Sequence, residues 1–150
     1  MGEFNVTELE PAPFAYLTRT CAARDVSRTV SETFAALSTA FATAGATPQG
    51  APMAHFSPGA DDKVNVELGF PVSEHVTGPL HIAGLSIAET YAGRAMCAVH
   101  GGDYASLRET YDKMIAAIRA AGMTPAADMW ERYGGEGDAV LVEVIWPVVF

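Results

Sequence analysis

Hydrophobic and polar residues follow a helical period in two stretches of this chain, and the two stretches match each other. Residues 33–48 carry apolar side chains every three or four positions and end in Ala-Gly-Ala-Thr-Pro, and residues 110–125 repeat this spacing and end in Ala-Gly-Met-Thr-Pro. The spacing predicts helices over about 25–44 and 103–121, each with one apolar face. Glycine followed by proline is a typical helix stop, because glycine adopts the left-handed cap and proline cannot extend the helix.

Strand-like alternation surrounds both helices and extends the match between the two halves. Residues 64–72 (Val-Asn-Val-Glu-Leu-Gly-Phe-Pro-Val) align with residues 140–148 (Val-Leu-Val-Glu-Val-Ile-Trp-Pro-Val), so that Glu67 and Glu143 fall at equivalent places. One strand is expected before each helix and a hairpin after it. The predicted strands are 14–20, 52–57, 64–70, 94–100, 128–134 and 140–146, with a further short strand near Ile82 or Ile87 in the linker.

These patterns predict an α+β fold of two tandem strand-helix-strand-strand repeats, about 4–72 and 80–150, whose antiparallel sheets form a central cleft. A repeat of about 70 residues would bury too little surface to be stable alone, so we expect one domain over residues 1–150. Hydrophobic residues make up 49% of the chain and charged residues 18%, which is the composition of an ordinary folded domain.

Charge and targeting signals exclude several classes of protein. The chain has a formal net charge of −9 and only nine scattered Lys and Arg residues, so we expect no direct nucleic-acid binding. No apolar run reaches the roughly 20 residues that cross a bilayer. The first residues lack a secretion signal, so we expect a cytoplasmic protein without membrane contact. The two isolated cysteines, Cys21 and Cys97, suit reduced structural thiols. The oligomeric state stays open, and a homodimer is one of the alternatives.

The sequence predicts neither a metal site nor a cofactor. The four histidines show no close paired spacing with one another or with carboxylates of the kind that metal ligands adopt. The glycine-rich signatures of nucleotide binding and the nucleophile elbow of hydrolases are also absent from the sequence.

Glutamates on the last strand of each repeat are candidate functional groups. One face of the strand 140–146 is wholly apolar and is expected to pack on the helix, whereas the other face carries Glu143 between Leu141 and Ile145. Leucine and isoleucine suit open solvent poorly, so we expect Glu143 and its counterpart Glu67 to line the cleft. The alternative is that both are ordinary surface carboxylates.

A third carboxylate, Glu131, has no counterpart in the first half, where Ala54 takes its place. Alternation puts Glu131 on one face of its strand with Tyr133, and Trp130 on the other face with Arg132. Enclosure would raise the pKa of Glu131 unless a cation or hydrogen-bond donors offset it. Such a carboxylate can pair with a positive charge on a ligand or serve as a general acid or base. The alternative is a salt bridge to Arg94, Arg132 or another arginine.

Tyr16 and Met96 lie on the first strands of the two repeats. By alternation they are expected to face the cleft, where an amphipathic ring and an adaptable thioether suit apolar ligands of varied shape. The alternative is that both side chains fill the core.

Several segments point to a known family when they are taken in order. They are residues 100–107 (His-Gly-Gly-Asp-Tyr-Ala-Ser-Leu), 129–133 (Met-Trp-Glu-Arg-Tyr) and 142–148 (Val-Glu-Val-Ile-Trp-Pro-Val), preceded in the first half by 66–72 (Val-Glu-Leu-Gly-Phe-Pro-Val). This ordered set resembles the DNA gyrase inhibitor-like (GyrI-like) family, and the resemblance covers essentially the whole chain.

The resemblance implies two strand-helix-strand-strand repeats around a central cleft, the module that serves as the effector-binding domain of multidrug-responsive transcription regulators. In that module a buried glutamate and nearby aromatic residues receive lipophilic, often cationic compounds. Glu131 occupies the matching place, with Glu143 and Tyr133 as companions, and we expect Glu131 and Glu143 to point into one sheltered hollow shared by the two repeats. No helix-turn-helix precedes the module in this sequence, so the chain resembles the stand-alone members. Some of these are similar to hydrolases that open the cyclopropane rings of DNA-alkylating natural products, with which Trp130 beside Glu131 is compatible.

The sequence therefore supports three functions. The first is a stand-alone protein that binds lipophilic small molecules, either cationic or electrophilic. The second is a detoxifying hydrolase that uses Glu131 and Glu143 as catalytic carboxylates. The third is a protein-interaction module, which would expose an apolar patch. The candidate ligand-binding residues are Tyr16, Phe56, Glu67, Met96, Trp130, Glu131, Tyr133, Glu143 and Ile145.

Overall fold

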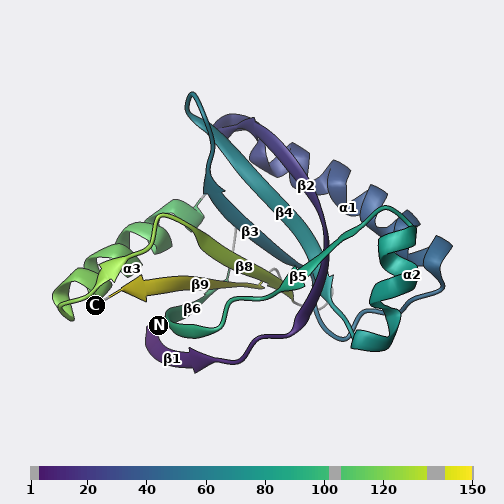
Figure 1. Cartoon of the computed structure of the whole chain (residues 1–150). Coiled ribbons are helices and arrows are strands. Elements are labelled where there is room, and N and C mark those ends of the chain that lie inside the picture. Colours follow the sequence, from purple (N-terminus) through teal and green to yellow (C-terminus); the bar gives the residue numbers. More distant parts are fainter. Residues whose placement is uncertain (1–3, 102–105, 135–140, 150) are drawn as a thin grey trace. The chain divides into compact units, whose positions relative to one another are not determined.

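The computed structural model describes residues 4–101, 106–134 and 141–149, and the chain forms two compact units (Figure 1). The first-repeat unit comprises Pro11–Thr90, and the second-repeat unit comprises the chain from Tyr91 onward together with the residues before Pro11. Each unit has antiparallel strands and one long helix, so the predicted α+β class is confirmed. The expected helix start at Asp103 and strand start at Val140 lie outside the described residues.

The first-repeat unit has the predicted order of strand, helix, strand and strand. Its elements are β2 (Pro13–Ala22), α1 (Val26–Ala44), β3 (Met53–Pro58), β4 (Lys63–Pro71), α2 (Thr77–Ile82) and β5 (Ser86–Glu89), with 3-10 turns at Ala23–Asp25 and Glu74–Val76. Helix α1 ends at Gly45, whose φ of 65° is the left-handed cap that the sequence predicted. The short strand near Ile87 is confirmed, whereas Ile82 ends the short helix α2.

The second-repeat unit has the same order, with two additions. Its elements are β1 (Asn5–Leu9), β6 (Gly93–Gly101), α3 (Leu107–Ala120), β7 (Thr124–Pro125), β8 (Met129–Gly134) and β9 (Leu141–Val149). The two-residue strand β7 pairs with the end of β9. Strand β1, which the sequence did not predict, pairs with β6.

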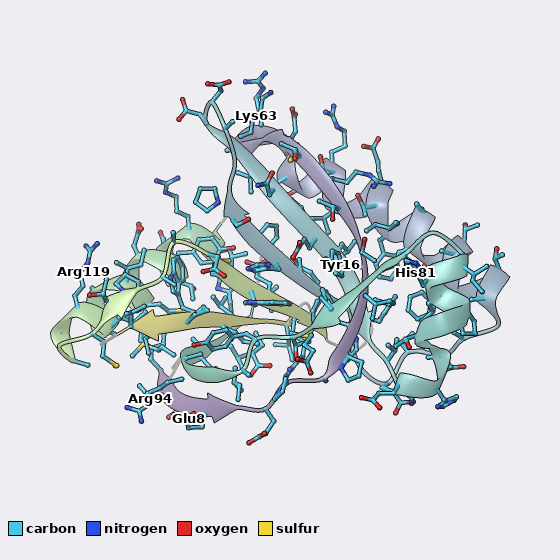
Figure 2. All side chains as sticks on the ribbon, viewed as in Figure 1. Glu8, Tyr16, Lys63, His81, Arg94 and Arg119 are labelled. Atoms are coloured by element: carbon cyan, nitrogen blue, oxygen red, sulfur yellow. The ribbon has the colours of Figure 1, made fainter. Side chains whose placement is uncertain are left out.

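The two units have the same strand order. Each unit also contains one edge strand that, in the sequence, directly precedes the first strand of the other repeat. The order is β3-β4-β2-β5 in the first-repeat unit and β8-β9-β6-β1 in the second-repeat unit. In the sequence β1 precedes β2 but pairs with β6, while β5 precedes β6 but pairs with β2. The repeats have therefore exchanged their edge strands. An ion pair between Glu8 Oε1 and Arg94 Nε, 3.1 Å long, joins β1 to β6, and both residues are labelled in Figure 2.

Helix α1 covers the face of its sheet that alternation predicted. Phe34 and Phe41 of α1 meet the ring of Phe70 on β4 edge-on, with ring centroids 5.9 and 5.0 Å apart. Val66 and Leu68, on the same face of β4, are fully buried. We call this the helix face of each sheet and the opposite side the far face.

The second-repeat unit packs in the same way. Val142 and Val144 of β9 are fully buried, and Tyr111 of α3 meets Trp146 of β9 edge-on at 5.9 Å. These valines and the tryptophan are among the residues that the sequence assigned to the helix face. Within the residues that the structure describes, no helix is both long and apolar enough to span a membrane.

Gly69 on β4 is the position where close packing most restricts the residue type. It pairs with Tyr16 on β2 and with Met53 on β3. An added Cβ would lie 2.1 Å from the carbonyl oxygen of Ala15 and 2.7 Å from Tyr16 Cβ. Any side chain at this position would therefore push β2 and β4 apart.

We expect Gly69→Ala to lower the free energy of unfolding by about 1–3 kcal/mol, because the backbone of β2 must shift to admit the methyl group. Denaturant unfolding of the whole protein measures this loss. Gly78→Ala in α2 is the matched control, because no atom lies within 4 Å of its added Cβ. Equal stability of the two variants would contradict the packing argument.

Candidate functional site

The carboxylate of Glu131 on β8 is buried between a strand and a helix. Its side chain is one of the few buried polar or charged groups, with only 3% of the residue exposed. Glu131 pairs with Val144 in the sheet and therefore lies on the helix face. Tyr111 of α3 donates a hydrogen bond to Glu131 Oε2, and Tyr133 of β8 donates one of 2.7 Å to Glu131 Oε1. Both carboxylate oxygens thus have a phenol donor.

Burial controls the protonation of this group. Loss of water around Glu131 raises the pKa of its carboxyl group above the ordinary value, although the bonds from Tyr111 and Tyr133 and the nearby His100 act in the opposite direction. Burial and the negative charge of Glu131 together raise the pKa of the Tyr111 phenol. Tyr111 therefore stays protonated and keeps donating to the carboxylate.

No arginine or lysine in the described part of the chain pairs with Glu131. Arg132, the neighbour in sequence, instead bonds Glu143 at 2.7 Å, and Arg94 bonds Glu8. The alternative that Glu131 forms a salt bridge to an arginine is therefore wrong for the described residues. Among the described residues, the carboxylate has hydrogen bonds from two phenols and no arginine or lysine partner.

A buried histidine lies on the same face of the sheet. His100 of β6 is 8% exposed, and it pairs with Val142, which in turn pairs with Tyr133. Its Nδ1 lies 2.8 Å from the hydroxyl oxygen of Thr110 in α3, and its Nε2 lies 3.3 Å from the hydroxyl oxygen of Ser106. His100 therefore links the start of α3 to the sheet. One of its two partners on the helix, Thr110, directly precedes Tyr111 in the sequence.

The expectation that Glu131 and Glu143 share one hollow is wrong. Glu143 pairs with Arg132, the residue after Glu131, so the two carboxylates point to opposite faces of the same sheet. Glu143 is about one-third exposed and forms an ion pair with Arg132. Its counterpart Glu67 is similarly exposed and lies 2.8 Å from His55 Nδ1. Of the three candidate glutamates only Glu131 is buried.

The remaining candidate residues are divided between the two faces. Met96 pairs with Trp146 on the helix face and is 4% exposed, so its expected position beside the glutamates of the far face is wrong. Phe56 pairs with Val66 and also lies on a helix face. Trp130 and Ile145 pair with each other on the far face, where both are buried.

Tyr16 lies on the far face of the first-repeat unit, as alternation predicted. It pairs with Gly69 and stacks on Phe14, with ring centroids 5.3 Å apart. Burial, and then the charge of Glu67, raise the pKa of Tyr16. Its side chain is labelled in Figure 2.

The described residues contain no group of three or more His, Cys, Asp or Glu side chains that could hold a metal ion. Both cysteines are free thiols. Burial and the charge of Glu143 raise the pKa of Cys97 to about 11, so this thiol is protonated and a poor nucleophile at neutral pH.

Sequence reasoning missed Tyr111, His100 and Thr110 as partners in the site. Tyr111 lies in the stretch 110–125, whose apolar spacing predicted a helix, and a tyrosine on the buried side of a helix also carries a hydroxyl that needs a partner. A candidate buried glutamate on a strand and a tyrosine on the helix that covers the strand could therefore have predicted the hydrogen bond between them.

Solved structures of known proteins share this fold, although no similar sequence was found. A scan of protein-family models found no match, and a search of characterised protein sequences found none either. Among solved structures, the C-terminal domain of EcmrR matches with a TM-score of 0.74 at 15% identity, over 99% of this chain and 98% of that domain. SAV2435, solved bound to tetraphenylphosphonium, matches with a TM-score of 0.65 at 12% identity, over 98% of this chain and 94% of that one.

A third solved structure is described as a hydrolase from Listeria innocua. It matches with a TM-score of 0.65 at 10% identity, over 98% of this chain and 92% of that one. The chain therefore has the GyrI-like fold over nearly its whole length, as the resemblance of its sequence segments implied.

Glu131 should make the stability of the protein depend on pH. Between the ordinary pKa of a glutamate and the raised pKa of Glu131, the folded protein keeps a proton that the unfolded chain has released. Stability should therefore fall as pH rises through that window, because the charged carboxylate is the less favourable form in the folded state.

We expect Glu131→Gln, which has no charge to lose, to flatten this decline above the ordinary pKa of a glutamate, about 4.3. Denaturant unfolding at several pH values measures the slope. Glu109→Gln is the matched control, because Glu109 is an exposed residue of α3. A slope in Glu131→Gln that equals the wild-type slope would show that burial does not perturb this carboxyl group.

Proposed function

We propose that this protein binds lipophilic small molecules, above all cationic ones, at the buried carboxylate of Glu131. The observation that carries the proposal is a carboxylate with two phenol donors and no arginine or lysine partner among the described residues. A buried charge that lacks a counter-charge is costly, and a cation brought by a ligand would offset that cost.

The aromatic residues around Glu131 fit the same kind of ligand. Tyr111 and Tyr133 contact the carboxylate, and Trp146 packs against Tyr111. Aromatic rings attract cations through their negatively charged faces and offer apolar surface to bulky substituents. The solved complex of SAV2435 with tetraphenylphosphonium, a lipophilic cation, supports this proposal by its shared fold.

Binding of tetraphenylphosphonium tests the role of the charge. We expect Glu131→Gln to weaken binding at least tenfold, or about 1.4 kcal/mol, because the variant keeps the shape of the side chain but loses its charge. Isothermal titration calorimetry at neutral pH measures the dissociation constant.

Two controls separate charge from shape in this experiment. Triphenylphosphine oxide, which is neutral and similar in bulk, should bind equally well to the wild type and to Glu131→Gln. Glu109→Gln, an exposed change on α3, should bind the cation like the wild type. Equal binding of the cation to the wild type and to Glu131→Gln would refute the proposed role of the carboxylate. If neither compound binds and the protein instead captures a protein partner, the interaction-module alternative is favoured.

A second candidate function is the hydrolysis of strained cyclopropane rings. The structural similarity to a Listeria innocua hydrolase favours it. In this role Glu131, whose raised pKa lets it hold a proton, would act as the general acid or base while water adds across the ring bond. Glu143 stays a proposed second carboxylate, although it lies on the other face of the sheet and pairs with Arg132.

Product analysis with an electrophilic cyclopropane tests this activity. We expect ring-opened product to form with the wild type and to fall at least a hundredfold in Glu131→Gln, because general acid–base catalysis contributes about 10²–10⁴ in rate. Glu143→Gln then decides whether the second carboxylate takes part. Binding of the compound without any product would leave the protein as a binding protein and exclude this second function for that substrate.

A further inference from the structure

Ser106 sits at the start of α3 but does not cap the helix. A serine at this position commonly accepts a hydrogen bond from a backbone N–H of the first turn. The side chain of Ser106 makes no such bond within the described residues. Its hydroxyl oxygen instead lies 3.3 Å from Nε2 of His100. The hydroxyl therefore lies within reach of an imidazole nitrogen.

The other side of the His100 ring is also fixed. Its Nδ1 lies 2.8 Å from the hydroxyl of Thr110, one turn further along α3. When the Nδ1 proton is donated to Thr110, Nε2 presents its lone pair to the Ser106 hydroxyl, the tautomer that a general base needs. His100 is buried at 8% exposure, whereas Ser106 is partly exposed and can be reached from solvent.

A carboxylate lies on the same face of the sheet as His100. Glu131 shares the helix face with His100, and the two residues interact electrostatically. A hydroxyl nucleophile, an oriented imidazole and a nearby carboxylate are the parts that acyl transfer uses in hydrolases of several unrelated folds.

We propose that Ser106 and His100 form a nucleophile and general-base pair that hydrolyses small carboxylic esters. His100 Nε2 takes the hydroxyl proton as Ser106 Oγ forms a bond to the ester carbonyl carbon. The bond from that carbon to the leaving oxygen then breaks, and the leaving oxygen takes the proton from His100. Water attacks the acyl-serine in the same way, and releases the carboxylic acid and free Ser106. Thr110 is a positioning residue, since its hydroxyl holds Nδ1 of His100.

This activity goes beyond the proposed binding function and does not depend on it. Ester hydrolysis requires the hydroxyl of Ser106, whereas binding of a cation requires the charge of Glu131. Ser106→Ala should therefore abolish the first while binding of tetraphenylphosphonium is retained, because Thr110 still links His100 to α3. Failure of either proposal can be recognised without reference to the other.

Hydrolysis of p-nitrophenyl acetate by the whole protein, followed by release of nitrophenolate, tests the pair. We expect the rate to fall at least a hundredfold in Ser106→Ala and in His100→Gln, because the acyl-serine route needs both the nucleophile and the general base, and general-base assistance contributes about 10²–10⁴ in rate. Ser86→Ala and His75→Gln are matched controls, because both residues are exposed and lie in the first-repeat unit. Both controls should keep the wild-type rate.

A fluorophosphonate provides a second, covalent measurement. It should add one phosphonyl group to the wild type with loss of fluoride, and peptide mapping should place the group on Ser106. If His100→Gln does not fold by circular dichroism, Ser106→Ala and this labelling decide between the outcomes. An equal rate of hydrolysis in the wild type and Ser106→Ala, or labelling at a residue other than Ser106, would overturn the proposal.

Discussion

The free-energy cost of keeping the Glu131 carboxylate away from water constrains much of the second-repeat unit. A buried carboxylate without partners is costly by several kcal/mol, so each of its oxygens needs a donor. Tyr133 comes from the same strand, two residues on, and Tyr111 comes from the helix that covers it. His100 fastens that helix to the sheet through Thr110 and Ser106. The orientation of α3 on its sheet and the solvation of one carboxylate are therefore coupled.

The sequence predicted the duplicated elements well, because periodicity depends only on which side of an element is buried. The register of neighbouring strands depends on hairpin geometry, and alternation within one strand does not reveal it. Alternation correctly predicted which residues share a face with Glu131 on its own strand, and likewise for Glu143. It did not predict how the two strands pair, so the two glutamates were wrongly expected on one face of the sheet. Strand β1 was missed because its five residues are nearly all exposed and show no buried side.

Comparison of equivalent positions shows how the two repeats have diverged. Ala54 pairs with Leu68 as Glu131 pairs with Val144, so the register confirms that the first repeat has a methyl group where the second has the buried carboxylate. On the far faces, the contact between His55 and Glu67 in the first repeat corresponds to the ion pair between Arg132 and Glu143 in the second repeat. A partly exposed glutamate with a basic side chain as its partner is present on the far face of both repeats, whereas the buried carboxylate of Glu131 is replaced by Ala54 in the first repeat. Specialisation has therefore occurred on the helix face.

The exchanged edge strands have a consequence for the origin of the chain and for its dissection. A single ancestral repeat that carried its edge strand ahead of its first strand could complete its sheet by swapping that strand with an identical copy. Fusion of two such genes would yield the pairing seen here, with β1 beside β6 and β5 beside β2. A fragment cut between the repeats would separate each sheet from one of its own strands. A circular permutation that joins the last residue to the first would instead keep the second-repeat unit contiguous.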